Sequence, residues 1–220
     1  MQYYISLLFI TLFGCKLNYK NANTDNGHEA TILITKKENC IYSERKGRAQ
    51  LLKQQFTEDP NQLNEAIITS YLTDSLISCW YGTQWNFYGT TQIPGNGSIA
   101  CGYFVTTVLQ DAGIKLNRVK LAQCASEEMI KKLTIKNSIF RFRNQSLLAF
   151  AETIKQQEKG LYIIGLDFHT GFIYHTGDEL YFIHASYAEP KVVRKEKVSE
   201  SGVLAASKYK IIGKVNFNTN

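Results

Sequence analysis

The sequence predicts an α+β fold in which an antiparallel sheet packs against helices. Residues 161–166 form an apolar, strand-like run, and a β-hairpin signal follows it. In that signal, residues 169–174 and 180–184 are rich in Phe, Ile and Tyr and flank a turn-type sequence. Upstream, apolar residues recur at helical spacing in several segments. With 220 residues, 44% of them hydrophobic, the chain can build the core of a single domain.

The N-terminus has the pattern of an export signal. Its apolar stretch, from Tyr3 to Phe13, is too short to span a bilayer but suits a signal peptide. It ends in LFGC, which resembles the lipobox of bacterial lipoproteins and implies lipidation of Cys15. We therefore expect residues 1–15 to be a lipoprotein signal peptide; the alternatives are a plain signal peptide or an apolar start that stays attached.

A polar tether and a single domain are expected after Cys15. Residues 16–44 are polar and rich in Asn near their start, with a possible edge strand at 30–35. Residues 45–220 form the predicted domain. It begins with a helix over 45–56, and Asp59-Pro60 has the form of an N-cap followed by proline at the first position of a second helix, which we expect to reach about Ser78.

Residues 80–97 differ from their surroundings because they are rich in Gly, Thr and aromatic residues. We predict a loop. Its exposed aromatic side chains either line a substrate cleft or belong to a connection that wraps around the core.

Cys101 lies in the first turn of the next predicted helix, which we expect to begin after an N-cap at Ser98 and to stop at Gly113. Amides of a first helical turn point outward unpaired, and the helix dipole there favours negative charge. We therefore expect a lowered thiol pKa, a reactive Cys101, and amides suited to hold an oxyanion. The alternative is a buried structural cysteine.

The remaining elements complete the predicted domain. We expect a short helix starting at Ser126, a helix over 146–159 capped by Ser146 and stopped by Gly160, a solvated charged connection over 191–200, and a last strand over 209–217.

The predicted hairpin brings histidines together. If Thr176 and Gly177 form a two-residue loop, His169 lies opposite His184, with Cβ atoms roughly 5 Å apart. One imidazole can then act as a base while the other holds its ring and tautomer. The alternative is an aromatic pair packed on the sheet. The same register leaves His175 at the turn, away from the pair.

The order of a helix-borne Cys, a strand His and a second His across a hairpin resembles the NlpC-type papain-like cell-wall peptidases. Three stretches are similar to family motifs: GTQWNFYG (82–89) to G-T-P-Y-x-x-G-G, ACGYFV (100–105) to D-C-S-G-x-V, and HTGFIY (169–174) with FIHAS (182–186) to H-V-G-I-Y and F-I-H-A-S. The sequence departs from the family at Ala100, which replaces Asp, at Gly102-Tyr103, which replaces Ser-Gly, and at Trp85 and Tyr88.

The resemblance implies a papain-like fold and a cysteine peptidase or amidase that cuts amide bonds of peptidoglycan stem peptides through an acyl-enzyme. Cys101 would be the nucleophile, His169 the general base and His184 its orienting partner. Trp85 and Gly102 would contact the substrate. Asp167, two residues before His169, is a rival orienting residue. No metal or cofactor is expected.

Charge and cysteine content bear on partners and location. The net charge of +6 is interspersed along the chain, so no nucleic-acid-binding stripe is expected. We expect a monomer in the cell envelope, held to the membrane through its lipid anchor alone. There is no C-x-x-C pair and no zinc spacing; Cys40, Cys79 and Cys124 are interpreted as structural, and the sequence leaves any disulfide pairing open.

Two other functions remain open at this stage. The atypical residues around Cys101 fit a non-catalytic lipoprotein that binds peptidoglycan or peptides on the same fold. A Cys-His acyltransferase would use the same residues.

Overall fold

The computed structural model describes residues 40–60 and 64–218, all within one compact unit, Thr31–Asn220. The predicted signal peptide, Cys15 and the strand over 30–35 lie outside the described residues. The described chain is an α+β structure whose main sheet has six antiparallel strands in the order β3-β8-β4-β5-β6-β7. The strands are β3 (Phe140–Arg143), β4 (Gly160–Leu166), β5 (Thr170–His175), β6 (Leu180–Ala185), β7 (Val193–Lys197) and β8 (Tyr209–Lys214).

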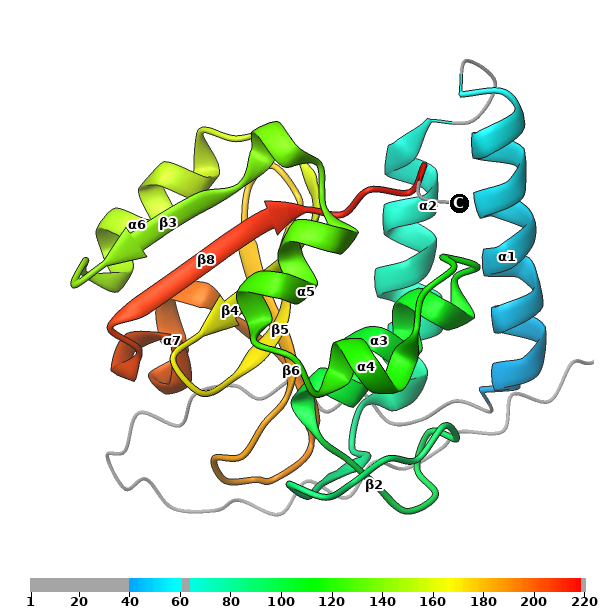
Figure 1. The fold of residues 1–220 in the computed structure, drawn as a ribbon, viewed down its shortest axis with the longest axis horizontal. Coiled ribbons are helices and arrows are strands. Elements are labelled where there is room, and N and C mark those ends of the chain that lie inside the picture. The colour runs from blue at the N-terminus through cyan, green and yellow to red at the C-terminus, as the bar shows by residue number, and fades with distance from the viewer. Residues whose placement is uncertain (1–39, 61–63, 219–220) are drawn as a thin grey trace, which may run out of the picture. The chain divides into compact units, whose positions relative to one another are not determined.

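Helices cover both faces of the sheet. Along β4 every residue is buried, with Leu161 and Ile163 in one hydrophobic core and Tyr162 and Ile164 in the other. The second core packs against helices α6 (Leu147–Lys155) and α7 (Gly202–Ala206). The first packs against α1 (Tyr42–Glu58), α2 (Glu65–Tyr71), α3 (Cys101–Asp111) and α5 (Ser126–Leu133). In Figure 1, α1, α2 and α3 lie to the right of β4, β5 and β6, and α6 and α7 lie to the left. Burial on both faces explains why this strand reads as a continuous apolar run.

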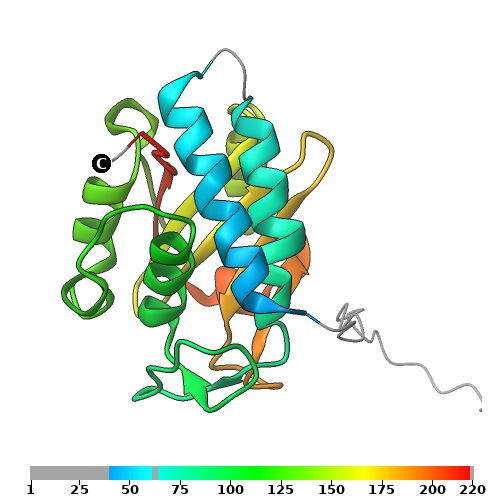
Figure 2. The same cartoon turned by 90° about the vertical axis from the view of Figure 1, so that its right-hand side faces the viewer.

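The two N-terminal helices lie side by side on the first face (Figure 2). They are α1 (Tyr42–Glu58) and α2 (Glu65–Tyr71), and α2 continues as a π-helical segment, Leu72–Leu76, and a 3₁₀ segment, Ile77–Trp80. A disulfide between Cys40 and Cys79 joins the chain before α1 to this 3₁₀ segment. The predicted cap was wrong: Asp59 ends α1, and Asn64 caps α2 by accepting a hydrogen bond from the Ala66 amide.

The Cys101 helix also begins later than expected. Ser98 belongs to a two-residue strand, β2 (Ser98–Ile99), which pairs in parallel with β1 (Gln84–Trp85). The helix, α3, spans Cys101–Asp111 with Ala100 as its N-cap, so Cys101 is its first residue. Its stop is as predicted, because Gly113 takes a φ of 92° just beyond the last turn. Helices α4 (Arg118–Ala122) and α5 (Ser126–Leu133) follow, and α5 begins where predicted.

The hairpin turn is longer than predicted. His175 pairs with Leu180, so the connection has four residues, 176–179, instead of the two-residue loop. Thr176 explains the difference, because its hydroxyl both donates to the Glu179 carbonyl and accepts from the Glu179 amide, each at 3.1 Å. The register is therefore shifted by two residues, which leaves every side chain on its predicted face.

The charged segment over 191–200 was wrongly predicted as a solvated connection. It contains edge strand β7, which pairs with β6. Within it, Arg194 is only 8% exposed and forms an ion pair with Glu196, with Nε and Oε2 3.0 Å apart. Opposite charges that neutralise each other allow this strand to be partly buried. The last strand is confirmed but ends at Lys214 instead of 217. The Ser146 cap of α6 is confirmed, whereas the helix ends at Lys155, before the predicted stop, and Gly160 begins β4. In the parts of the chain that the structure describes, no helix has the length and apolar character needed to cross a membrane.

Candidate active site

Cys101 opens α3 with a free, half-buried thiol. The Ala100 N-cap supplies no side-chain hydrogen bond to the first turn. Instead, backbone amides of Thr170, Gly102 and Cys101 itself are directed at the sulfur and favour the thiolate. Burial outweighs them and raises the pKa of the Cys101 thiol, so the lowered pKa expected from the helix terminus is wrong. The resting group is a neutral thiol.

Gly102 allows the start of α3 to pack closely on the end of α4. A Cβ on Gly102 would lie 2.3 Å from the carbonyl oxygen of Ala122. Only glycine fits at this approach, which gives a local reason for a glycine where the resembled family has serine. Gly102 therefore positions the thiol and also lines the cavities beside it.

His169 and His184 meet as predicted, although they are not directly opposite. His169 Nε2 lies 2.9 Å from His184 Nδ1, and the two rings are almost perpendicular. The space for His184 comes from Gly171, where a Cβ would lie 2.9 Å from the His184 Cβ. His169, just before β5, then reaches the His184 ring from a diagonal position.

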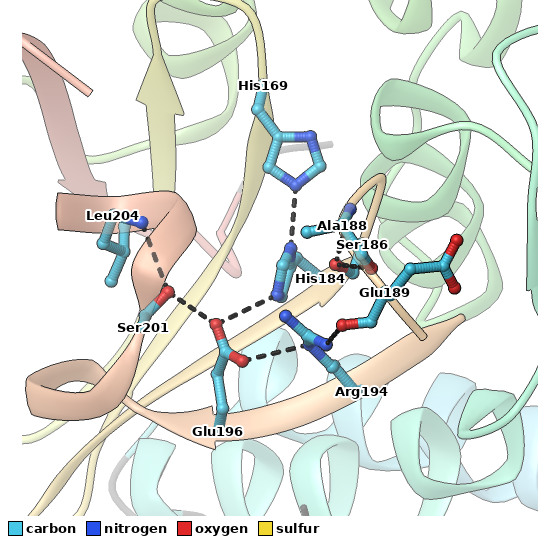
Figure 3. Close-up of polar contacts among 9 residues, drawn as sticks. All are labelled: His169, His184, Ser186, Ala188, Glu189, Arg194, Glu196, Ser201 and Leu204. Carbon is cyan, nitrogen blue, oxygen red and sulfur yellow. Dashed lines mark hydrogen bonds and ion pairs between the residues drawn. The ribbon is translucent and has the colours of Figure 1, made fainter. Parts of the chain in front are cut away.

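A carboxylate that the sequence analysis missed continues this contact. Glu196 Oε1 lies 3.3 Å from His184 Nε2, while Glu196 also accepts a hydrogen bond from the Ser201 hydroxyl. Arg194 holds the other carboxylate oxygen and donates from Nη1 to the Glu189 carbonyl at 2.9 Å. Figure 3 shows His169, His184 and Glu196 in line, with Arg194 and Ser201 on either side of the carboxylate.

These contacts fix the protonation states of the three residues. Burial lowers the pKa of His184, and burial with the nearby His184 and Arg194 lowers that of His169 well below its usual value, so both imidazoles are neutral. Burial would raise the pKa of Glu196, but His184, Ser201 and Arg194 lower it overall, so the carboxylate is ionised. An ionised Glu196 favours the proton on His184 Nε2. His184 Nδ1 then accepts from His169 Nε2, which leaves Nδ1 as the basic nitrogen of His169.

Neither Asp167 nor His175 takes part. The Asp167 carboxylate accepts hydrogen bonds from the Ser207 hydroxyl and the amides of Lys208 and Tyr209, so it holds the start of β8. His175 lies at the turn, where Nδ1 accepts from the Gly177 amide and Nε2 lies 3.3 Å from the Lys155 carbonyl. Of the two possible orienting residues, His184 is the one beside His169.

Two cavities meet at Cys101 and His169. The larger, of about 860 Å³, also contains Trp85, the predicted substrate-binding residue. The smaller, of about 200 Å³, extends toward Ser126 at the start of α5. A group bound across both would present its central atoms to the thiol and the imidazole. Among the described residues, no group of three or more His, Cys, Asp or Glu side chains is arranged to hold a metal ion.

Glu196 and Arg194 were missed because a charged run was taken as solvent-exposed. The sequence nevertheless contains one indication of a strand here. Arg194 and Glu196 carry opposite charges two positions apart and follow Val192 and Val193. In a strand, that spacing places them on one face, where they can pair.

Comparison with known proteins gives no further assignment. No family model, no curated protein and no solved structure matches this chain.

Proposed function

We propose that the protein is a cell-envelope cysteine hydrolase, a peptidase or amidase that cuts amide bonds of peptidoglycan stem peptides on a papain-like, NlpC-type fold. One observation carries the proposal: a thiol at a helix start and a neutral imidazole, backed by His184 and Glu196, line the same cavities. A buried aromatic pair without function would need neither the carboxylate nor the open space beside it.

The residues support a general-base mechanism. His169 Nδ1 takes the thiol proton as the Cys101 sulfur attacks the carbonyl carbon, and first-turn amides of α3 stabilise the oxyanion. The imidazolium then returns this proton to the nitrogen of the breaking C–N bond, which releases an amine and leaves a thioester on Cys101. Water, deprotonated by His169, hydrolyses the thioester to a carboxylic acid and restores the thiol. His184 and Glu196 hold the base in its tautomer throughout.

The cysteines support an exported protein. Disulfides persist in oxidising compartments such as the periplasm or the cell surface, and Cys40 and Cys79 are bonded. This agrees with the export signal and with a lipid anchor at Cys15 as the proposed membrane attachment. We also propose that the protein acts as a monomer without a cofactor.

The test is digestion of purified peptidoglycan by the lipid-anchored protein, with products identified by mass spectrometry. We expect new amine and carboxyl ends from the wild type and none from Cys101→Ala or His169→Gln. His175→Gln serves as the matched histidine control and should retain nearly full activity. Intact wall after wild-type treatment, or equal cutting by Cys101→Ala, would refute the proposal.

A further inference from the structure

Four aromatic side chains of the described chain are exposed to solvent, and all four border the larger cavity. Phe168 is 97% exposed, Tyr88 84%, Phe87 71% and Tyr187 41%. Every other Phe, Tyr or Trp among the described residues is buried or half-buried. Large apolar side chains gathered at one place on a surface mark an interaction site. We call these four residues the aromatic rim.

Two tight turns carry the most exposed of these rings. Phe87 and Tyr88 lie at the tip of a turn that the Gly89 amide closes by donating to the Asn86 carbonyl at 2.9 Å, and their ring centroids are 5.1 Å apart. Phe168 lies at the tip between β4 and β5, where a backbone hydrogen bond of 2.8 Å closes the turn. Such rings offer apolar surface to a partner without a rearrangement of the backbone.

The described chain begins at the same end of the molecule. The disulfide between Cys40 and Cys79 holds the start of α1, and Cys79 lies just before the segment that leads to β1. The turn with Phe87 and Tyr88 follows β1 and precedes β2. In Figure 1, α1 begins at its lower end, and β2 lies at the bottom of the molecule. The proposed lipid anchor at Cys15 precedes Cys40 in the chain, so the membrane attachment joins the domain at the end that carries the aromatic rim.

The charged side chains that border the aromatic rim carry both signs. Lys208 and Asp167 line a third cavity together with Phe168. Lys191, whose carbonyl accepts from the β1 backbone, pairs with the exposed Glu189 at 3.6 Å. Around the larger cavity itself, no described side chain is Asp, Glu, Lys or Arg. A nucleic acid or a strongly acidic protein would need a surplus of positive charge here. Aromatic rings among polar groups instead fit the headgroup region of a bilayer.

We infer that the aromatic rim docks onto a phospholipid bilayer, with Phe87, Tyr88 and Phe168 inserted at the level of the headgroups. The lipid anchor proposed above keeps the surface near the membrane, and a tethered surface needs only a weak affinity of its own because its local concentration is high. Docking turns the mouth of the larger cavity toward the headgroups. It requires neither Cys101 nor His169 and therefore goes beyond the proposed hydrolysis.

Quenching of tryptophan fluorescence by brominated lipids tests the inference in the full-length, lipid-anchored protein. Bromine placed on the acyl chains close to the headgroup quenches the tryptophans that contact it. Phe168→Trp puts a reporter in the aromatic rim, and Leu148→Trp, at a position on α6 that is 70% exposed, is the matched control. After subtraction of the wild-type signal, we expect brominated phosphatidylcholine vesicles to quench Phe168→Trp strongly and to leave Leu148→Trp as bright as unbrominated vesicles do.

Further variants of the Phe168→Trp protein define the contact. Adding Phe87→Ser and Tyr88→Ser should reduce the quenching, because the neighbouring turn no longer inserts. Adding Cys101→Ala should leave the quenching unchanged. High salt should also change it little, since charges of both signs border the aromatic rim.

Other results would overturn the inference. These are an unquenched Phe168→Trp, equal quenching of the two reporters, or a protein that stays in solution beside the vesicles. A dimer that Phe168→Ser separates in sedimentation would assign the aromatic rim to a second copy of the chain instead. Wall cutting without quenching refutes the docking and leaves the proposed function standing, whereas quenching of a protein that cuts no wall supports the docking alone.

Discussion

At the residue scale, the direction in which His169 presents its basic nitrogen depends on Glu196. We predict that Glu196→Gln lowers kcat by about 10- to 100-fold while KM changes little. The amide can turn its NH₂ toward His184 Nε2, which places the His184 proton on Nδ1 and reverses the tautomer of His169. Steady-state kinetics on the wall substrate measure this effect.

A neutral residue at position 196 leaves Arg194 buried without its ion-pair partner. A control must therefore separate a loss of activity caused by the wrong His169 tautomer from one caused by unfolding. The double variant Arg194→Gln/Glu196→Gln removes both charges, and Glu196→Asp keeps the carboxylate. We expect Glu196→Asp to recover part of the activity and the double variant to fold but stay slow. Wild-type kcat in the folded double variant would contradict a positioning role for Glu196.

The Cys101 thiol gives a second prediction at this scale. Because burial raises its pKa above the ordinary 9.0, the rate of alkylation by iodoacetamide should rise only at alkaline pH. His169→Gln should leave that profile almost unchanged, since the imidazole is neutral and forms no resting ion pair. A rate plateau extending into acid that His169→Gln abolishes would show a thiolate–imidazolium pair and exclude the neutral resting state.

The residues of the site differ in how far the sequence predicts them. Cys101, His169 and His184 were predicted from local patterns, and a register error of two residues did no harm because it preserved the faces of the strands. Glu196 could be predicted only if β7 were recognised as a strand. Arg194 and Glu196 themselves hide that strand, because their charges make the segment look solvent-exposed. The pKa of Cys101 depends on burial among distant segments, which no local pattern contains.

At the element scale, the contact between α3 and α4 sets the place of the thiol. Gly102→Ala would drive a methyl group into the Ala122 carbonyl, so we expect a loss of roughly 1–3 kcal/mol in the free energy of unfolding and a large loss of activity. Thermal unfolding and wall digestion measure the two effects.

Gly47→Ala in α1 is the matched control. A Cβ there meets nothing within 4 Å, and alanine favours a helix over glycine by roughly 0.5–1 kcal/mol. This variant should be slightly more stable and fully active. If Gly102→Ala were as stable and active as Gly47→Ala, the close approach of α3 and α4 would not matter for the site.

Element boundaries show a second limit of sequence reasoning. Helix interiors were predicted because apolar spacing is imposed by the core they face, as in α3 and α6. The first residues of the helices were predicted less well. Asp59 and Ser98 are suitable capping residues. Asp59 instead closes α1, where its amide donates to the Gln55 carbonyl, and Ser98 joins β2 because its backbone pairs with β1.

At the scale of the whole molecule, two hydrophobic cores enclose the sheet, and the buried rings of His169 and His184 contact Phe182 of the second core. Two neutral imidazoles in such a place link folding to pH. Their pKa values in the folded protein are lowered below the ordinary 6.5 that an unfolded chain would show. At a pH between the lowered pKa values of the folded protein and 6.5, the unfolded chain binds more protons than the folded one. Protonation therefore favours unfolding.

We therefore predict full stability above about pH 6.5, and a progressive loss as the pH falls below it toward the lowered pKa values of the folded state. Each imidazole contributes at most about 1.4 kcal/mol per pH unit over that interval. Denaturant unfolding at a series of pH values measures the slope. His169→Gln/His184→Gln should flatten it below pH 6.5, because neither replacement titrates, whereas a wild-type slope in that double variant would assign the acid sensitivity to other groups.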